Sequence, residues 1–172
     1  MPTHLIIDGY NVLGRIGKLS GHMESAREGL LRDLAAYSHR KNHPITIVFD
    51  GWQQGQPLEE REHRAGVQVI YSKRGERADQ VIQRLAREYG ADCAVVSSDQ
   101  EVARSARVSG AVVIGAQEFS VRLQAAPRSE GIAHKELDTG EEEAPPRDPK
   151  KKGNPRKLPK ALRQRARLLK RF

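Results

Sequence analysis

Five short apolar runs recur through the first 125 residues, and they restrict the fold more than any other feature. Each run is rich in β-branched residues and is bounded by polar residues or glycine, which is typical of short strands. The predicted strands are residues 5–7, 45–49, 67–71, 94–96 and 111–114. Because these runs are continuously apolar instead of alternating, they favour a mainly parallel sheet covered on both faces.

Helical patterns fall between most of these runs. Residues 24–40, 78–89 and 118–123 carry apolar side chains at helical spacing. A further helix is predicted to start at Ser98, since Ser98 and Glu101 have the spacing of a capping box, and to run toward Gly110. The alternation of strands and helices predicts a three-layer α/β domain over residues 1–125.

The positive charge lies almost entirely beyond this domain. Through residue 125 there are sixteen Lys and Arg against fifteen Asp and Glu, whereas residues 126–172 hold fourteen against seven. From Arg147 onward, twelve basic residues face Asp148 alone. Such an excess indicates a polyanionic partner, which is usually nucleic acid or an anionic membrane surface.

The C-terminal region divides by composition into two parts. Residues 126–149 mix Gly, Pro and Ser with an acidic triplet, which predicts a flexible linker. Residues 150–172 place leucines at helical spacing among Lys and Arg, which predicts a basic tail able to form an amphipathic helix and to bind RNA or a ribosomal surface. The expected RNA-binding residues are Lys150, Lys151, Lys152, Arg156, Lys157, Arg163, Arg165 and Arg167.

The chain shows no sign of export or of membrane insertion. Cys93 is the only cysteine, so no intrachain disulfide is possible, and its apolar surroundings predict a buried, reduced thiol. There is neither a signal-peptide core nor a run of 18 apolar residues. We therefore expect a cytoplasmic protein without a membrane partner.

Acidic residues follow the predicted strands at the edge where parallel α/β sheets bind their ligands. Asp8, Asp50 and Asp99 come after the first, second and fourth strands, and Asp79 lies in the first turn of the helix after the third. Glu76, one turn earlier, is a fifth candidate. Each acid alone has an ordinary explanation as a turn, helix-start or capping residue, but these explanations do not predict that all of them meet at one edge.

Carboxylates brought together repel one another, and a divalent cation is the simplest relief. Mg²⁺ and Mn²⁺ prefer hard oxygen ligands and are anchored by few protein carboxylates together with substrate phosphates. The chemistry this predicts is phosphodiester hydrolysis. Asn11 lies close enough to Asp8 in sequence to orient a carboxylate or a phosphate, with a turn role as its alternative, and Tyr10 and Trp52 are either base-stacking or packing residues.

Other chemistries fit less well. A phosphatase using Asp8 as nucleophile would need a second Asp two residues later, where this chain has Tyr10. His39 and His43 are four residues apart but lack a nearby third ligand for zinc. A non-catalytic RNA- or ribosome-binding factor that acts through the basic tail stays open as the second class.

Four motifs together resemble one family, the YacP-like branch of the NYN domains within the PIN-like nuclease group. The motifs are Asp8-Gly9-Tyr10-Asn11, Phe49-Asp50-Gly51, Glu76-Arg77-Ala78-Asp79 and Val95-Val96-Ser97-Ser98-Asp99. Two positions depart from the family pattern: Arg77 stands where Thr is frequent, and Ser97-Ser98 replaces the commoner Thr-Ser.

The resemblance implies a PIN-like fold, an acidic pocket holding Mg²⁺ or Mn²⁺, and single-stranded RNA as substrate. Asp8, Asp50, Asp79 and Asp99 match the family's acidic positions, and Asn11 matches its Asn. We therefore predict a metal-dependent endoribonuclease in which these five residues are catalytic and the four acids hold the metal.

Overall fold

The three-dimensional structure is a computed structural model that describes residues 3–17, 22–51 and 57–125. All of these belong to one unit that spans Met1–Pro127. The predicted linker at 126–149 and basic tail at 150–172 lie outside the described residues, as does Trp52. Their predicted roles therefore stay predictions.

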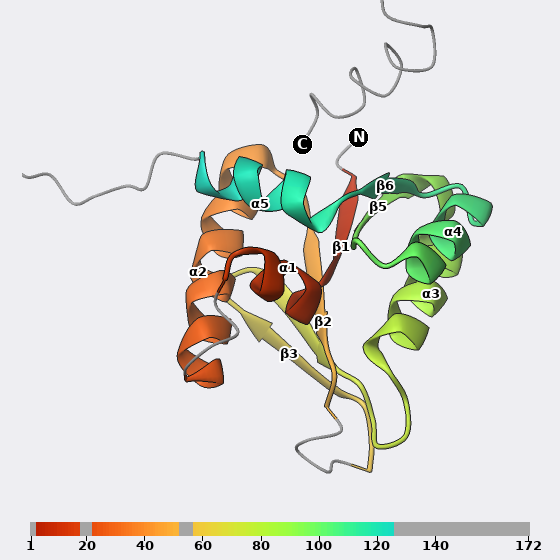
Figure 1. Cartoon of the computed structure of the whole chain (residues 1–172), viewed down its shortest axis with the longest axis horizontal. Coiled ribbons are helices and arrows are strands. Elements are labelled where there is room, and N and C mark those ends of the chain that lie inside the picture. Colours follow the sequence, from red (N-terminus) through yellow and green to blue (C-terminus); the bar gives the residue numbers. More distant parts are fainter. Residues whose placement is uncertain (1–2, 18–21, 52–56, 126–172) are drawn as a thin grey trace, which may run out of the picture. The chain divides into compact units, whose positions relative to one another are not determined.

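A six-stranded sheet forms the centre of the described domain, in the order β3-β4-β2-β1-β5-β6 (Figure 1). All neighbouring strands pair in parallel except β3 and β4, which are antiparallel. The strands are β1 (His4–Asp8), β2 (Ile45–Phe49), β3 (Glu60–Arg64), β4 (Val67–Tyr71), β5 (Cys93–Val96) and β6 (Val112–Ile114). The predicted mainly parallel sheet is confirmed.

Helices cover both faces of this sheet. In Figure 1, α1, α2 and α5 lie on one side and α3 and α4 on the other. The helices are α1 (Gly9–Arg15), α2 (Met23–Lys41), α3 (Ala78–Tyr89), α4 (Gln100–Val108) and α5 (Ala116–Gln124), with a short 3₁₀ turn, η2 (Gly90–Asp92), before β5. The three-layer α/β architecture predicted from the sequence is confirmed.

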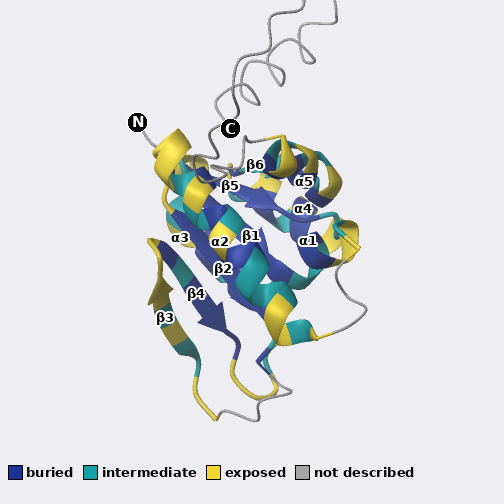
Figure 2. Cartoon of the chain, turned by 90° about the vertical axis from the view of Figure 1, so that its left-hand side faces the viewer, coloured by how far each residue is buried: buried dark blue, intermediate teal, exposed yellow. Residues whose placement is uncertain are grey.

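The central strands are buried along nearly their whole length (Figure 2). Ile6, Val48 and Ile70 pack with Val81 and Ile82 of α3 in one core cluster. Coverage on both faces explains why these strands read as continuous apolar runs. Cys93, as expected, is buried.

The structure contains one strand that the sequence patterns did not predict, so the predicted number of five strands is wrong. β3 consists of charged residues and carries no apolar pattern. It pairs with β4 through the two-residue turn Ala65–Gly66, whose φ angles are both positive, at 51° and 83°. The strand lies at the edge of the sheet, where charged side chains oppose pairing with another chain.

The start of α4 also differs from the prediction. Asp99, not Ser98, caps this helix, because Asp99 Oδ1 accepts hydrogen bonds from the amides of Glu101 and Val102. The Ser98 hydroxyl instead accepts a hydrogen bond from the amide of Ala116. The predicted capping box is therefore wrong by one residue.

None of the helices built from the described residues is long and apolar enough to cross a membrane.

Gly51 is fixed by a close approach of two backbone segments. Its amide donates to the Ser72 hydroxyl at 3.1 Å, and a Cβ atom at this position would overlap the carbonyl oxygen of Ser72. We expect Gly51→Ala to lower the free energy of unfolding by about 1–3 kcal/mol. The reason is that the Ser72 carbonyl belongs to the backbone and cannot rotate away from the added methyl group as a side chain could. Urea unfolding measures this, with Gly115→Ala as the control because Gly115 has open space around it. Equal losses in the two variants would contradict the prediction.

Candidate acidic site

The parallel register brings three strand ends to one edge of the sheet. Asp8 lies beside Val48, and Ile7 lies beside Val96. Asp50 directly follows β2, and its Oδ1 accepts a hydrogen bond of 2.6 Å from the amide of Ala78 at the start of α3. The first residues of α3, which include Asp79, are thereby tied to the same edge.

Three of the four predicted acids use one oxygen to cap a helix. Asp8 Oδ1 accepts from the amide of Asn11 in α1 at 3.1 Å, Asp50 Oδ1 caps α3, and Asp99 Oδ1 caps α4. The helix-capping role expected of Asp99 is therefore confirmed. Capping uses only one oxygen of each of the three carboxylates. Within the described residues, the second oxygens of Asp50 and Asp99 accept no hydrogen bond.

Asp8 is the most deeply placed of these acids, with 7% of its surface exposed. Burial is the main reason that its pKa rises from 3.8 to about 6. The negative charges of Asp79 and Asp50 raise the pKa further, whereas hydrogen bonds from the Asn11 amide and the Ser97 hydroxyl lower it. The ionised form of Asp8 is therefore destabilised by burial and by the neighbouring negative charges.

Asp79 connects the other acids electrostatically. Its pKa is raised first by burial and also by the negative charges of Asp99 and Asp50. The guanidinium of Arg77 opposes this rise from 2.9 Å. Since Asp8 also senses Asp79 and Asp50, the structure brings the four sequence-predicted acids into one electrostatic group.

Two serines and Asn11 hold this group together. The Ser97 hydroxyl donates to Asp8 Oδ2 at 3.3 Å and accepts from the amide of Asp99 at 3.1 Å. Asn11 Oδ1 accepts from the amide of Ser98 at 3.0 Å, which ties α1 to the loop before α4. Sequence reasoning gave no role to Ser97, whose position between β5 and Asp99 was the available signal.

The neighbouring candidates have structural partners. Tyr10 packs edge-on against Phe49, with ring centroids 5.2 Å apart, as the packing interpretation expects. Glu76, the fifth acid considered, forms an ion pair of 2.7 Å with Arg84, which also pairs with Glu59. The charge of Glu76 is therefore already neutralised by the Arg84 guanidinium.

The donor set fits a hard divalent cation held partly by water and substrate. Among the described residues, no three His, Cys, Asp or Glu side chains lie close enough to hold a metal ion together. Mg²⁺ does not require three, because it is commonly held by one or two carboxylates together with waters and phosphates. The available donors here are all carboxylate oxygens, and their mutual repulsion is relieved by a cation.

Residues 5–163 match the YacP-like NYN domain. The chain belongs to this family. The match extends past residue 125 through the predicted linker and into the predicted tail. NYN domains are part of the PIN-like nuclease superfamily, so the family supports a nuclease-type function related to RNA.

Relatives from Bacillus subtilis agree with this membership. The uncharacterized protein YacP is 33% identical over 86 residues, which cover 48% of this chain, and the chain spans about half (50%) of the length of that curated relative. Two crystal structures of Rae1 (YacP), one of them a mutant, superpose with TM-scores of 0.58 and 0.59 at 27% and 26% identity. They cover 70% and 71% of this chain and 73% and 75% of Rae1. The PIN-like fold expected from the resemblance is confirmed.

Burial of the Asp8 charge has a measurable cost to stability. In EDTA at pH 7.5 we expect Asp8→Asn to raise the free energy of unfolding by about 1–3 kcal/mol, since a pKa raised from 3.8 to about 6 marks a destabilised ionised form. The gain should shrink as the pH falls from about 6 toward 3.8, because the folded wild type then takes up a proton at Asp8.

Urea unfolding at several pH values measures this difference. Asp92→Asn is the matched control, since Asp92 is exposed and lies outside the acidic group. Destabilisation by Asp8→Asn at pH 7.5 would show that the carboxylate stabilises the fold without a cation.

Proposed function

We propose that this protein is a divalent-metal-dependent endoribonuclease that hydrolyses phosphodiester bonds of single-stranded RNA. The observation that carries the proposal is the convergence of Asp8, Asp50, Asp79 and Asp99 at one sheet edge, where their charges repel one another. Membership in a nuclease superfamily supports the same chemistry. The buried Cys93 is in keeping with a reducing cytoplasm.

In this proposal Asp8 and Asp99 are the first ligands of Mg²⁺ or Mn²⁺, and Asp50 and Asp79 complete the pocket. When bound, the cation would activate water and stabilise the charge that develops on the phosphate. The protein's own contribution is to fix these carboxylates before substrate arrives. Ser97 holds Asp8 and the Asp99 backbone, and the capped starts of α3 and α4 hold Asp50 and Asp99.

Asn11 has a positioning role in the proposal. Its backbone amide fixes Asp8, while its side-chain oxygen accepts from Ser98 and holds the loop that leads to Asp99. One residue therefore joins the two strand ends that would bind the metal. The amide group of its side chain is also suited to donate to a substrate phosphate oxygen.

Asp99→Asn separates the structural role of Asp99 from its catalytic one. Asn caps helices about as well as Asp, so this variant should keep α4 and the stability of the fold. Loss of the charge should reduce cleavage by roughly 10²-fold or more, as for other single electrostatic contributions to catalysis. The measurement is cleavage of a mixed single-stranded RNA pool in Mg²⁺ or Mn²⁺, with and without ribosomes.

The matched variants in that assay are Asp8→Asn, which should also lose activity, and Asp92→Asn, which should keep it. EDTA should abolish all products. If wild-type protein cleaves nothing in either arm while it still binds RNA, the second candidate takes over, namely a non-catalytic RNA- or ribosome-binding factor that uses the basic tail. The charge of residues 147–172 is what favours that candidate.

We further propose that the tail at 150–172 supplies RNA affinity that depends on charge and not on sequence. Six phosphate contacts to single-stranded RNA would give a slope of about −4 to −5 in log K against log salt. Replacing Lys150, Lys151 and Lys152 with Gln should flatten the slope by up to about 2. Fluorescence anisotropy of a labelled single-stranded RNA in EDTA measures it.

A control with the same loss of charge is available in the domain. Arg32, Lys41 and Arg107 are exposed on helices α2 and α4, and their replacement with Gln should leave the slope nearly unchanged. An equal effect of both triple variants would mean that net charge alone governs binding, with no special role for the tail.

A further inference from the structure

Arg77 forms an ion pair with one of the acids of the acidic group. Its Nη2 lies 2.9 Å from Asp79 Oδ2. The two partners differ greatly in accessibility, since 76% of the Arg77 side chain is exposed and only 22% of the Asp79 side chain. An exposed cation is thus paired with a largely buried anion.

The backbone of Arg77 is held independently of this ion pair. The Arg77 amide donates to Gln80 Oε1 at 3.0 Å, and the Arg77 carbonyl accepts from the Gln80 amide at 3.0 Å. Within the described part of the chain, Asp79 is the polar partner of the guanidinium. The guanidinium can therefore leave Asp79 without disturbing the start of α3.

The ion pair partly compensates a local excess of negative charge. Asp79 lies near Asp50 and Asp99, whose charges disfavour its ionised form, and Arg77 is the basic group that opposes them. A divalent cation bound to these acids would supply the same compensation with a larger charge. Arg77 and the cation therefore compete for one carboxylate.

We infer that Arg77 is an exchangeable counter-ion, which neutralises Asp79 in the absence of metal and turns to a backbone phosphate of the RNA once a divalent cation binds Asp79. This inference rests on the proposed function. A planar guanidinium suits phosphate because it donates two parallel hydrogen bonds. Arg77 is thereby a substrate-positioning residue.

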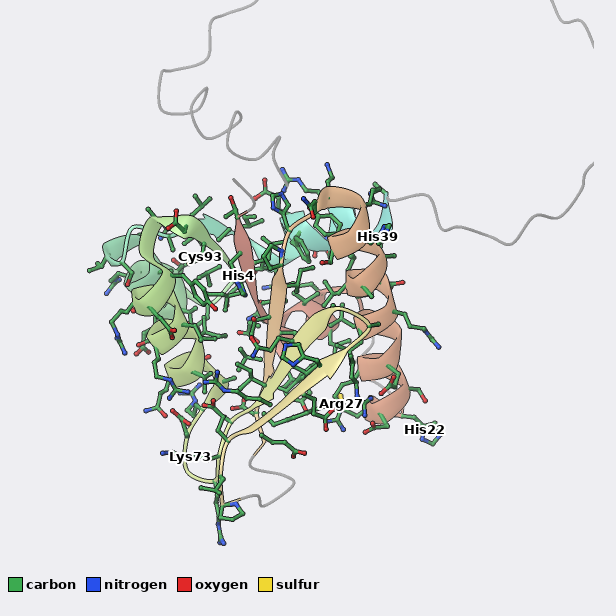
Figure 3. The ribbon with its side chains drawn as sticks, turned by 180° about the vertical axis from the view of Figure 1, so that it is seen from behind. His4, His22, Arg27, His39, Lys73 and Cys93 are labelled. Atoms are coloured by element: carbon green, nitrogen blue, oxygen red, sulfur yellow. The ribbon has the colours of Figure 1, made fainter. Side chains whose placement is uncertain are left out.

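The loop that carries Arg77 adds two more cations at the same border. Lys73 and Arg74 are exposed between β4 and α3, and Figure 3 shows Lys73 beyond the end of the sheet. Both ends of the loop are fixed, by the bond from the Gly51 amide to the buried Ser72 and by the ion pair of Glu76 with Arg84. Their positive charge would attract the phosphates of an RNA strand that approaches the acids.

The first test measures metal binding without RNA. Thermal unfolding of the full chain is followed over a range of Mn²⁺ concentrations for wild type, Arg77→Gln, Arg77→Lys and Arg87→Gln. Since exposed ion pairs are weak, removing the competitor should tighten the apparent Mn²⁺ affinity by about two- to fivefold in Arg77→Gln. Arg77→Lys keeps a competing charge and should resemble wild type. Arg87→Gln, at an exposed site near the other end of α3, is the matched control.

The second test measures cleavage of single-stranded RNA at saturating Mn²⁺. Arg77→Gln should raise KM several-fold with little change in kcat, because the residue holds substrate and not the reacting atoms. Arg77→Lys should give an intermediate KM, as a point charge replaces the planar guanidinium. Tighter Mn²⁺ binding together with a higher KM in the same variant is the expected signature.

The outcomes separate this inference from the function it rests on. If wild type binds Mn²⁺ and cleaves RNA while Arg77→Gln matches it in both assays, the counter-ion role is overturned and the proposed function stands. Weaker Mn²⁺ binding in Arg77→Gln would also overturn it, since a competitor cannot assist the metal. If Mn²⁺ gives wild type no added stability, the proposed metal site fails and the inference fails with it.

Discussion

A carboxylate at the start of a helix satisfies backbone amides that the helix itself leaves unpaired. Three helices of this domain depend on that interaction, because Asp8 caps α1, Asp50 caps α3 and Asp99 caps α4. The caps come from the ends of parallel strands, so the helix starts converge on one edge of the sheet. The positive ends of the helix dipoles therefore face the carboxylates and offset part of their mutual repulsion. The geometry that builds the fold therefore also lowers the cost of gathering these acids at one sheet edge.

This compensation is incomplete, and the remaining charge accounts for the other features of the site. Burial and the charges of Asp79 and Asp50 still raise the pKa of Asp8 to about 6. Asp79 lies near Asp50 and Asp99 and forms an ion pair with Arg77. Under the proposed function, a bound cation would relieve the repulsion that remains. Arg77 would then have two alternative partners, the Asp79 carboxylate and a phosphate of the RNA.

The sequence patterns predicted the elements that are marked by local apolar periodicity. They did not predict the strand that forms only through pairing with its neighbour. The buried strands and the longer helices were recognisable because apolar residues dominate them. β3 was not, since it is charged and exists through pairing with β4. The short α1 begins at Gly9 and is set by the Asp8 cap rather than by propensity. Strand ends indicated Asp8, Asp50 and Asp99, and the helix start after the third predicted strand indicated Asp79. The links through Ser97 and the ion pair of Arg77 with Asp79 arise instead from tertiary placement and side-chain reach.

The capping roles of the acids do not by themselves account for the choice of Asp at these positions. A cap requires an oxygen acceptor, which Asn or Ser provides about as well as Asp. For Asp99, which accepts two amides through one oxygen, the negative charge adds modestly to the cap. For Asp8 the charge is unfavourable, because the side chain is buried beside other acids. A neutral side chain such as Asn would keep the cap to the Asn11 amide without a buried charge, although its amide nitrogen could not accept the bond that the Ser97 hydroxyl donates. The charge of Asp8 is therefore not needed for the fold, and under the proposed function a bound cation would be the ligand that compensates it.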